Sequence, residues 1–149
     1  MTRNPALRYG FTLIELMAVV VILAVLAGVA LPKFFDYATT AKSASCKGAL
    51  GGLRSGVANF YANSVVNGGT GAWPTLAELT TLGTVMQGPI PENPYNASNT
   101  FTTGTWVNAT AAPRTVTGND GWAYWPGSAA VSPAQVWADS NTAALEKDF

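Results

Sequence analysis

The stretch Gly10-Phe-Thr-Leu-Ile-Glu-Leu-Met-Ala-Val-Val20 opens a long apolar run that ends at Leu31. At 1.5 Å per residue, Phe11–Leu31 forms a helix of about 30 Å, the thickness of the hydrocarbon core of a bilayer. One full charge, Glu15, lies inside this run. A charge at the middle of a membrane span costs about 2.5–3.5 kcal/mol, less near its end, and normally has a partner. The run therefore predicts a membrane-spanning helix with a carboxylate that needs an explanation.

Three interpretations of the run differ in how they account for the charge of Glu15. A secretory signal peptide accounts for the basic residues Arg3 and Arg8, but the run is longer than the usual apolar region of such a peptide. A plain membrane anchor, with the basic residues on the inner side, leaves the charge unexplained. The third interpretation makes Glu15 a docking charge. Cleavage between Gly10 and Phe11 would create an α-amine, which a neighbouring copy could offer to the carboxylate in a desolvated bundle.

The composition of the 149-residue chain excludes several kinds of chemistry. There is no histidine, and Cys46 is the single cysteine, so an intrachain disulfide is impossible. Charged residues make up 11% of the chain and the net charge is zero, which gives no sign of a nucleic-acid surface. No nucleophile elbow, phosphate loop or zinc-type cysteine pair is present. We expect a protein that is not an enzyme and holds no cofactor, with a membrane-anchored extracytoplasmic enzyme or binding protein as the distant alternative.

Beyond Pro32 the apolar residues no longer form a continuous run and instead recur with the period of an amphipathic helix. Apolar residues recur at spacings of three and four, which predicts an amphipathic helix that continues to near Val66; they are Cys46, Ala49, Leu50, Leu53, Val57, Phe60 and Tyr61. The glycines of Asn67–Gly71 are expected to end it. Thr75 with Glu78 three residues later predicts a capping box at the start of a short second helix.

The C-terminal part of the chain has the composition of short strands. Threonine-rich and aromatic segments alternate with turn signals such as Gly118–Gly121. The candidate strands are Thr100–Val107, Arg114–Thr117, Trp122–Trp125 and Val136–Ala138. We expect them to form a small antiparallel sheet that covers the apolar stripe of the helix. The predicted fold class is α+β, a long N-terminal helix packed against a small sheet.

The segment Arg8–Phe35 closely resembles the N-terminal signal of type IV pilins and pseudopilins. A short basic leader ends in Gly10, and Phe11, Glu15 and an apolar helix up to Pro32 follow. In that family a membrane peptidase cuts after the glycine and methylates the new N-terminal residue. The resemblance therefore implies a leader at residues 1–10, a membrane-spanning and polymerisation helix at 11–31, an amphipathic half at 32–66 and a head at 67–149.

The same resemblance implies a function and partners. Gly10 and Phe11 would be the processing residues, and Glu15 would guide the subunit into a helical filament of identical copies. The further partners implied are the prepilin peptidase and an inner-membrane platform with a separate ATPase. The precursor would lie in the inner membrane, and the product would be an extracellular pilus. The Pro-rich loop and Gly121–Tyr124 also resemble major pseudopilins of type II secretion, so a periplasm-spanning pseudopilus is the alternative.

Two further predictions concern the helix and the head. Gly28 and Pro32 are the weak points of the apolar helix, so we expect the backbone from Ala24 to Pro32 to extend on assembly while staying helical in lipid. Asp120 and Asp139 could supply oxygen ligands to calcium, which some pseudopilins hold. Their spacing matches no strict loop motif, which favours ordinary turn chemistry over a calcium site.

Overall fold

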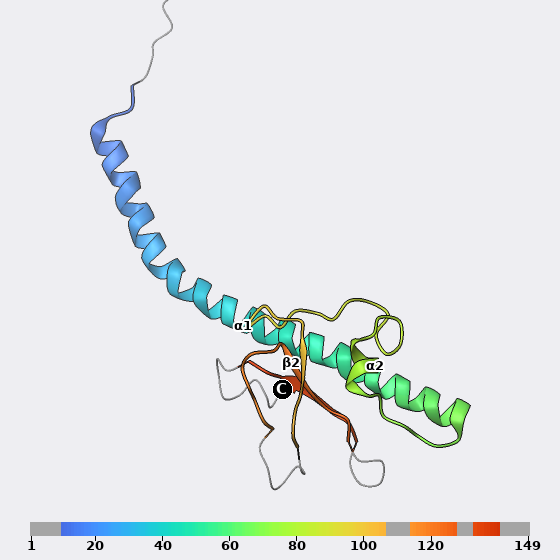
Figure 1. Ribbon diagram of the computed structural model, residues 1–149. Helices are drawn as coiled ribbons and strands as arrows, with labels where there is room; N and C mark the ends of the chain where they lie inside the picture. The colour runs from blue at the N-terminus through green and yellow to red at the C-terminus, as the bar shows by residue number, and fades with distance from the viewer. Residues whose placement is uncertain (1–9, 107–113, 128–132, 141–149) are drawn as a thin grey trace, which may run out of the picture. The chain divides into compact units, whose positions relative to one another are not determined.

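The computed structural model describes residues 10–106, 114–127 and 133–140 (Figure 1). The chain forms two compact units, Met1–Thr40 and Ala41–Phe149. Helix α1 (Leu13–Gly68) contributes to both units, whereas α2 and the three strands belong to the second unit; they are α2 (Leu76–Thr80), β1 (Phe101–Thr103), β2 (Trp122–Trp125) and β3 (Gln135–Ala138). This confirms the predicted α+β fold class. The predicted leader, apart from Gly10, lies outside the described residues.

Helix α1 continues through Pro32 and ends at the glycines, as the sequence predicts. The helix includes Pro32 and is continuous from Ala24 to Pro32 in the single chain. It ends at Gly68, and Gly69 follows with a φ of 71°, the left-handed conformation that glycine adopts at helix C-termini. The amide of Gly69 donates to the carbonyl of Val65 at 3.1 Å, which satisfies one of the last helical carbonyls.

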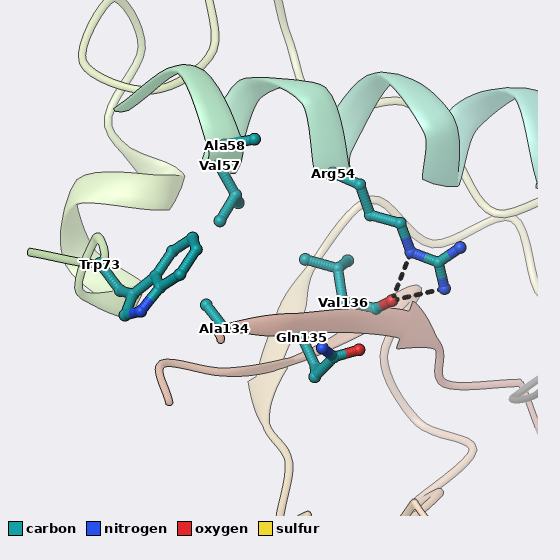
Figure 2. Close-up of a pocket in the computed structure, with 7 residues that line it drawn as sticks. All are labelled: Arg54, Val57, Ala58, Trp73, Ala134, Gln135 and Val136. Atoms are coloured by element: carbon teal, nitrogen blue, oxygen red, sulfur yellow. Dashed lines mark hydrogen bonds between the residues drawn. The ribbon is translucent and has the colours of Figure 1, made fainter. Parts of the chain in front are cut away.

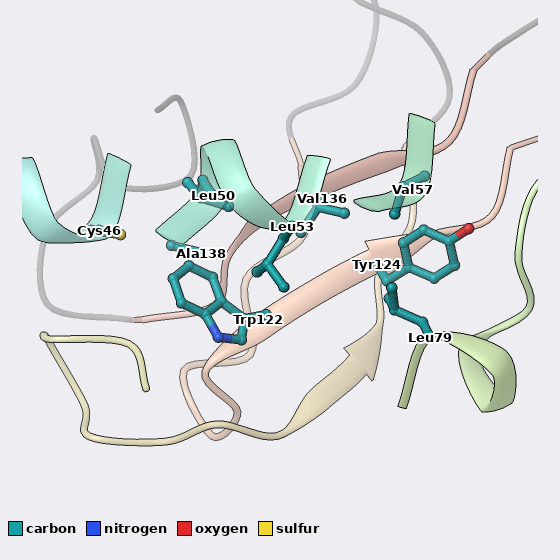
Figure 3. Close-up of a cluster of buried hydrophobic side chains, with 9 residues drawn as sticks. All are labelled: Cys46, Leu50, Leu53, Val57, Leu79, Trp122, Tyr124, Val136 and Ala138. Atoms are coloured by element: carbon teal, nitrogen blue, oxygen red, sulfur yellow. The ribbon is translucent and has the colours of Figure 1, made fainter. Parts of the chain in front are cut away.

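The core of the second unit forms where the apolar stripe of α1 meets the sheet (Figure 3). Cys46, Leu50, Leu53 and Val57 are the buried residues of the helix, as their spacing predicts. Trp122 and Tyr124 of β2 and Val136 and Ala138 of β3 pack against them, together with Leu79 of α2. Cys46 is part of this apolar cluster, where its thiol packs as a small buried hydrophobe.

The sheet is mixed, so the expectation of a purely antiparallel sheet is wrong in one pairing. β2 and β3 are antiparallel, with Ala123 opposite Trp137, but β1 and β2 are parallel, with Phe101 opposite Trp122. Parallel neighbours need a long crossover connection, and residues 104–121 provide it. Composition and turn signals can identify a strand, but they do not show whether the strand after a long connection runs parallel or antiparallel to its neighbour.

The segment Arg114–Thr117 does not form the predicted strand. Two of its backbone groups bond to side chains instead of to a ladder. The carbonyl of Thr115 accepts the indole N–H of Trp137 at 2.9 Å, and the amide of Thr117 donates to Oδ1 of Asp139 at 2.6 Å. The predicted strand at Thr100–Val107 is shortened to Phe101–Thr103, and Val107 lies outside the described residues.

The start of α2 confirms the predicted capping box. The amide of Glu78 donates to the Thr75 hydroxyl at 3.2 Å, and the amide of Thr75 donates to the Glu78 carboxylate at 2.8 Å. These hydrogen bonds lower the pKa of Glu78 below its ordinary value, because they stabilise the ionised form. The buried hydroxyl of Tyr124 donates to the carbonyl of Pro74, which ties the sheet to the residue before the cap.

Two glycines of the second unit give a test of its packing. A Cβ on Gly121 would lie 2.0 Å from the backbone carbonyl oxygen of Ser98, whereas one on Gly51 would meet nothing within 4 Å. We expect Gly121→Ala to lower the free energy of unfolding by about 1–3 kcal/mol through overpacking. The matched change Gly51→Ala should raise it by up to about 1 kcal/mol, because alanine is the better helix former.

The free energy of unfolding is measured by urea titration of the full chain in detergent, with tryptophan fluorescence as the signal. All five tryptophans lie beyond residue 72, so the signal reports the second unit. Equal effects of the two substitutions would contradict the close approach at Gly121.

Candidate functional site

The first unit presents an uncovered apolar surface. Every residue from Gly10 to Thr40 is exposed in the isolated chain, and by length and composition α1 is able to cross a membrane. The large side chains remain well exposed along the whole predicted span, from Phe11 at 77% to Leu31 at 58%. Fully burying one such side chain is worth about 1.5–3 kcal/mol. The surface therefore requires lipid or other helices around it.

Glu15 has a partner within its own chain. Thr12 precedes α1, and its amide and hydroxyl donate to Oε2 of Glu15 at 3.0 and 2.9 Å. The amide of Glu15 donates in turn to the Thr12 hydroxyl at 3.3 Å. These are the reciprocal bonds of a capping box, the same arrangement as at Thr75 and Glu78.

The sequence carries a signal for this contact, which the interpretation of Glu15 as a docking charge overlooks. Thr12-Leu-Ile-Glu15 has the same Thr-x-x-Glu spacing that correctly predicts the cap of α2 at Thr75-Leu-Ala-Glu78. The carboxylate at residue 15 therefore closes the N-terminus of α1, and also receives the favourable field of the helix dipole. A capping role does not exclude a docking role, because a carboxylate has more acceptor sites than the cap uses.

Gly28 and Pro32 lie within continuous helix. A Cβ on Gly28 would meet no atom within 4 Å, so nothing in the single chain requires a glycine there. Pro32 has no N–H to donate to the carbonyl of Gly28. The two residues together weaken one turn of a helix that is otherwise regular.

Asp120 and Asp139 lie close together in the head and accept hydrogen bonds from protein donors. Asp139 is fully buried, and its carboxylate accepts from the amide and hydroxyl of Thr117 and, at 3.4 Å, from the amide of Asp120. Oδ1 of Asp120 accepts from the hydroxyl of Thr100 at 2.6 Å. Within the described ranges no group of three or more His, Cys, Asp or Glu side chains could hold a metal. The contacts agree with turn chemistry, and the absence of a bound cofactor stays a prediction.

A pocket of about 220 Å³ lies between α1 and β3 in the second unit (Figure 2). Nε and Nη2 of Arg54 both donate to the carbonyl of Val136 at its edge, at 3.2 and 3.0 Å. Burial lowers the pKa of the Arg54 guanidinium, and the positive charge of Arg114 adds to the effect. The other lining residues are apolar or neutral, so the pocket contains neither a nucleophile nor a general base.

Comparison with known proteins agrees with the N-terminal pattern. Residues 6–31 match the family described as the prokaryotic N-terminal methylation motif. The chain is 37% identical over 65 residues to the fimbrial protein EcpC of Eikenella corrodens, which covers 44% of this chain and 39% of that protein. It is 41% identical over 68 residues to the type IV major pilin protein PilE1 of Neisseria gonorrhoeae, which covers 46% of this chain and 38% of the relative. No solved structure matches the chain.

The methylation motif and these relatives make the N-terminal part of the chain similar to type IV pilins. A fimbrial protein of Neisseria meningitidis serogroup A is also 41% identical, over 69 residues. The chain spans well under half the length of these relatives, 37–39% of each.

Proposed function

We propose that the chain is a prepilin, a structural subunit that is processed after Gly10 and assembled into a helical pilus filament. The observation that carries the proposal is the uncovered apolar surface of residues 11–31, which contains one carboxylate and lies within the matched methylation motif of residues 6–31. Such a surface is stable in lipid before assembly and among the helices of other copies afterwards. The similarity to proteins named fimbrial protein and major pilin favours a pilus over the pseudopilus alternative.

The location and partners of the chain follow from this role. The precursor would lie in the inner membrane and the assembled filament outside the cell. The proposed partners are further copies of the chain, a prepilin peptidase, and an inner-membrane platform driven by a separate ATPase. No catalytic step is assigned to the chain itself.

The first expected outcome concerns processing. We expect the mature protein to begin at Phe11 with a methylated α-amine, because Gly10 and Phe11 occupy the positions of the family's cleavage and methylation. Mass spectrometry of the protein purified from its native filaments measures this directly. An intact Met1, or a start near Leu31, would overturn the proposal.

The second outcome separates the charge of Glu15 from its role in the cap. Glu15→Gln keeps an oxygen that can accept the Thr12 bonds but removes the charge, whereas Thr12→Val removes the hydroxyl and keeps the charge. If the carboxylate docks on the α-amine of a neighbouring copy, filament yield should fall sharply with Glu15→Gln. Thr12→Val should retain most of the yield.

The yield is measured by shearing filaments from cells in which the variant is the sole copy. Total subunit in the membrane serves as the control, and it should not fall with Glu15→Gln, since a charge leaves the lipid. A normal yield from Glu15→Gln, or an equal loss from Thr12→Val, would assign Glu15 to the cap alone.

The third outcome concerns Gly28 and Pro32. In the single chain the helix is continuous across both residues. Within a filament, neighbouring helices surround this turn, and its extension would let the heads adopt their own spacing while residues 11–21 stay packed. A filament density map should show extended backbone between about Ala24 and Pro32. Unbroken helix from Phe11 to Val66 in that map would contradict this.

A further inference from the structure

Three large aromatic side chains directly follow the apolar run. Phe34, Phe35 and Tyr37 lie in α1 with exposed fractions of 68%, 66% and 69%. The rings of Phe34 and Phe35 meet edge to face, with centroids 6.4 Å apart, but this contact leaves most of their surface uncovered. Because all three belong to the first unit, the packed core of the second unit does not account for them.

The charges in the same stretch restrict what can surround these rings. Lys33 and Asp36 alternate with the aromatic residues, and both would be costly in the hydrocarbon core of a bilayer. Bulk water suits the charges and disfavours three exposed rings. The boundary between acyl chains and headgroups accommodates both, because rings insert at that level while a lysine reaches the phosphates.

We propose that Lys33–Tyr37 is an interfacial anchor that binds the lipid headgroup region of the leaflet opposite Glu15, and so sets the depth of Glu15 in the membrane. The stretch from Glu15 to Phe34 rises about 28 Å as a helix. The hydrocarbon core is about 30 Å thick. With the rings at one boundary, the Glu15 carboxylate therefore lies within a few ångströms of the other. The anchor explains why the membrane tolerates this charge, and it rests on the membrane-inserted precursor of the proposed function.

The test uses the full chain with Cys46→Ala, so that one introduced cysteine carries a spin label. Labels at Phe35→Cys, Met17→Cys and Val25→Cys probe the anchor, the neighbourhood of Glu15 and the middle of the span. The protein is reconstituted at low protein-to-lipid ratio into vesicles of phosphatidylcholine and phosphatidylglycerol. Label depth follows from the relative accessibility to oxygen, which concentrates in the acyl chains, and to a water-soluble nickel chelate.

We expect the labels at residues 35 and 17 at opposite boundaries and the label at residue 25 deep in the acyl chains. Removing the rings with Phe34→Ala, Phe35→Ala and Tyr37→Ala should shift the label at residue 17 by about 3 Å, two residues of helical rise, toward water. The matched triple change Val20→Ala, Val21→Ala and Leu23→Ala trims apolar surface inside the span and should leave the label at residue 17 where it was.

Two results would overturn the anchor while leaving the membrane span intact. A label at residue 35 fully open to the nickel chelate would place the stretch in water. A label there that is protected from both oxygen and nickel would place it against a second copy of the chain. If the chain did not enter the vesicles at all, the membrane-inserted precursor of the proposed function would fail as well.

Discussion

The arrangement of this chain depends on a single constraint, that one half of a long helix finds apolar cover within its own chain and the other half does not. From Cys46 to Val57 the stripe of α1 is covered by β2, β3 and α2. From Phe11 to Leu31 the apolar side chains point to all sides and none is buried. The first half can be stable only in lipid or among other helices. The isolated chain therefore leaves the apolar surface of residues 11–31 without the apolar surroundings that would stabilise it.

Glu15 is the exception within the uncovered half, and its carboxylate is less isolated than its position suggests. It satisfies the amide and hydroxyl of Thr12 and so closes the helix end, which otherwise leaves donors without partners. A group that is already held in one rotamer loses less side-chain entropy when it meets a second partner. The cap therefore lowers the entropic cost of the docking contact that we propose for this residue.

The features that depend on nearby residues could be predicted from the sequence. The length of α1, its buried stripe, the glycine end and the cap at Thr75 all follow from spacing and local chemistry. The parallel pairing of β1 with β2 could not be predicted, because it depends on the path of residues 104–121.

Two carboxylates show where the pattern of charges misleads. The sequence offers Asp139 as a weak calcium candidate, but the structure shows its carboxylate accepting a hydrogen bond from the amide of Thr117. The cap at Thr12 follows from the Thr-x-x-Glu spacing, yet a charge within an apolar run points first to a cation as its partner. In both cases the carboxylate accepts hydrogen bonds from neutral N–H and O–H donors. Such partners cannot be found by searching the sequence for a residue of opposite charge.

The contacts between α1 and the C-terminal strand also constrain the order in which the head can fold. Leu50 and Leu53 pack against residues 136 and 138, so the core joins segments far apart along the chain. Such contacts require closure of a long loop before any packing energy is gained, which makes folding slow. During synthesis the stripe of α1 therefore emerges long before the strands that cover it. The apolar N-terminal segment therefore has time to reach the lipid or the other helices that it requires, and folding of the head is delayed until the last strand is available.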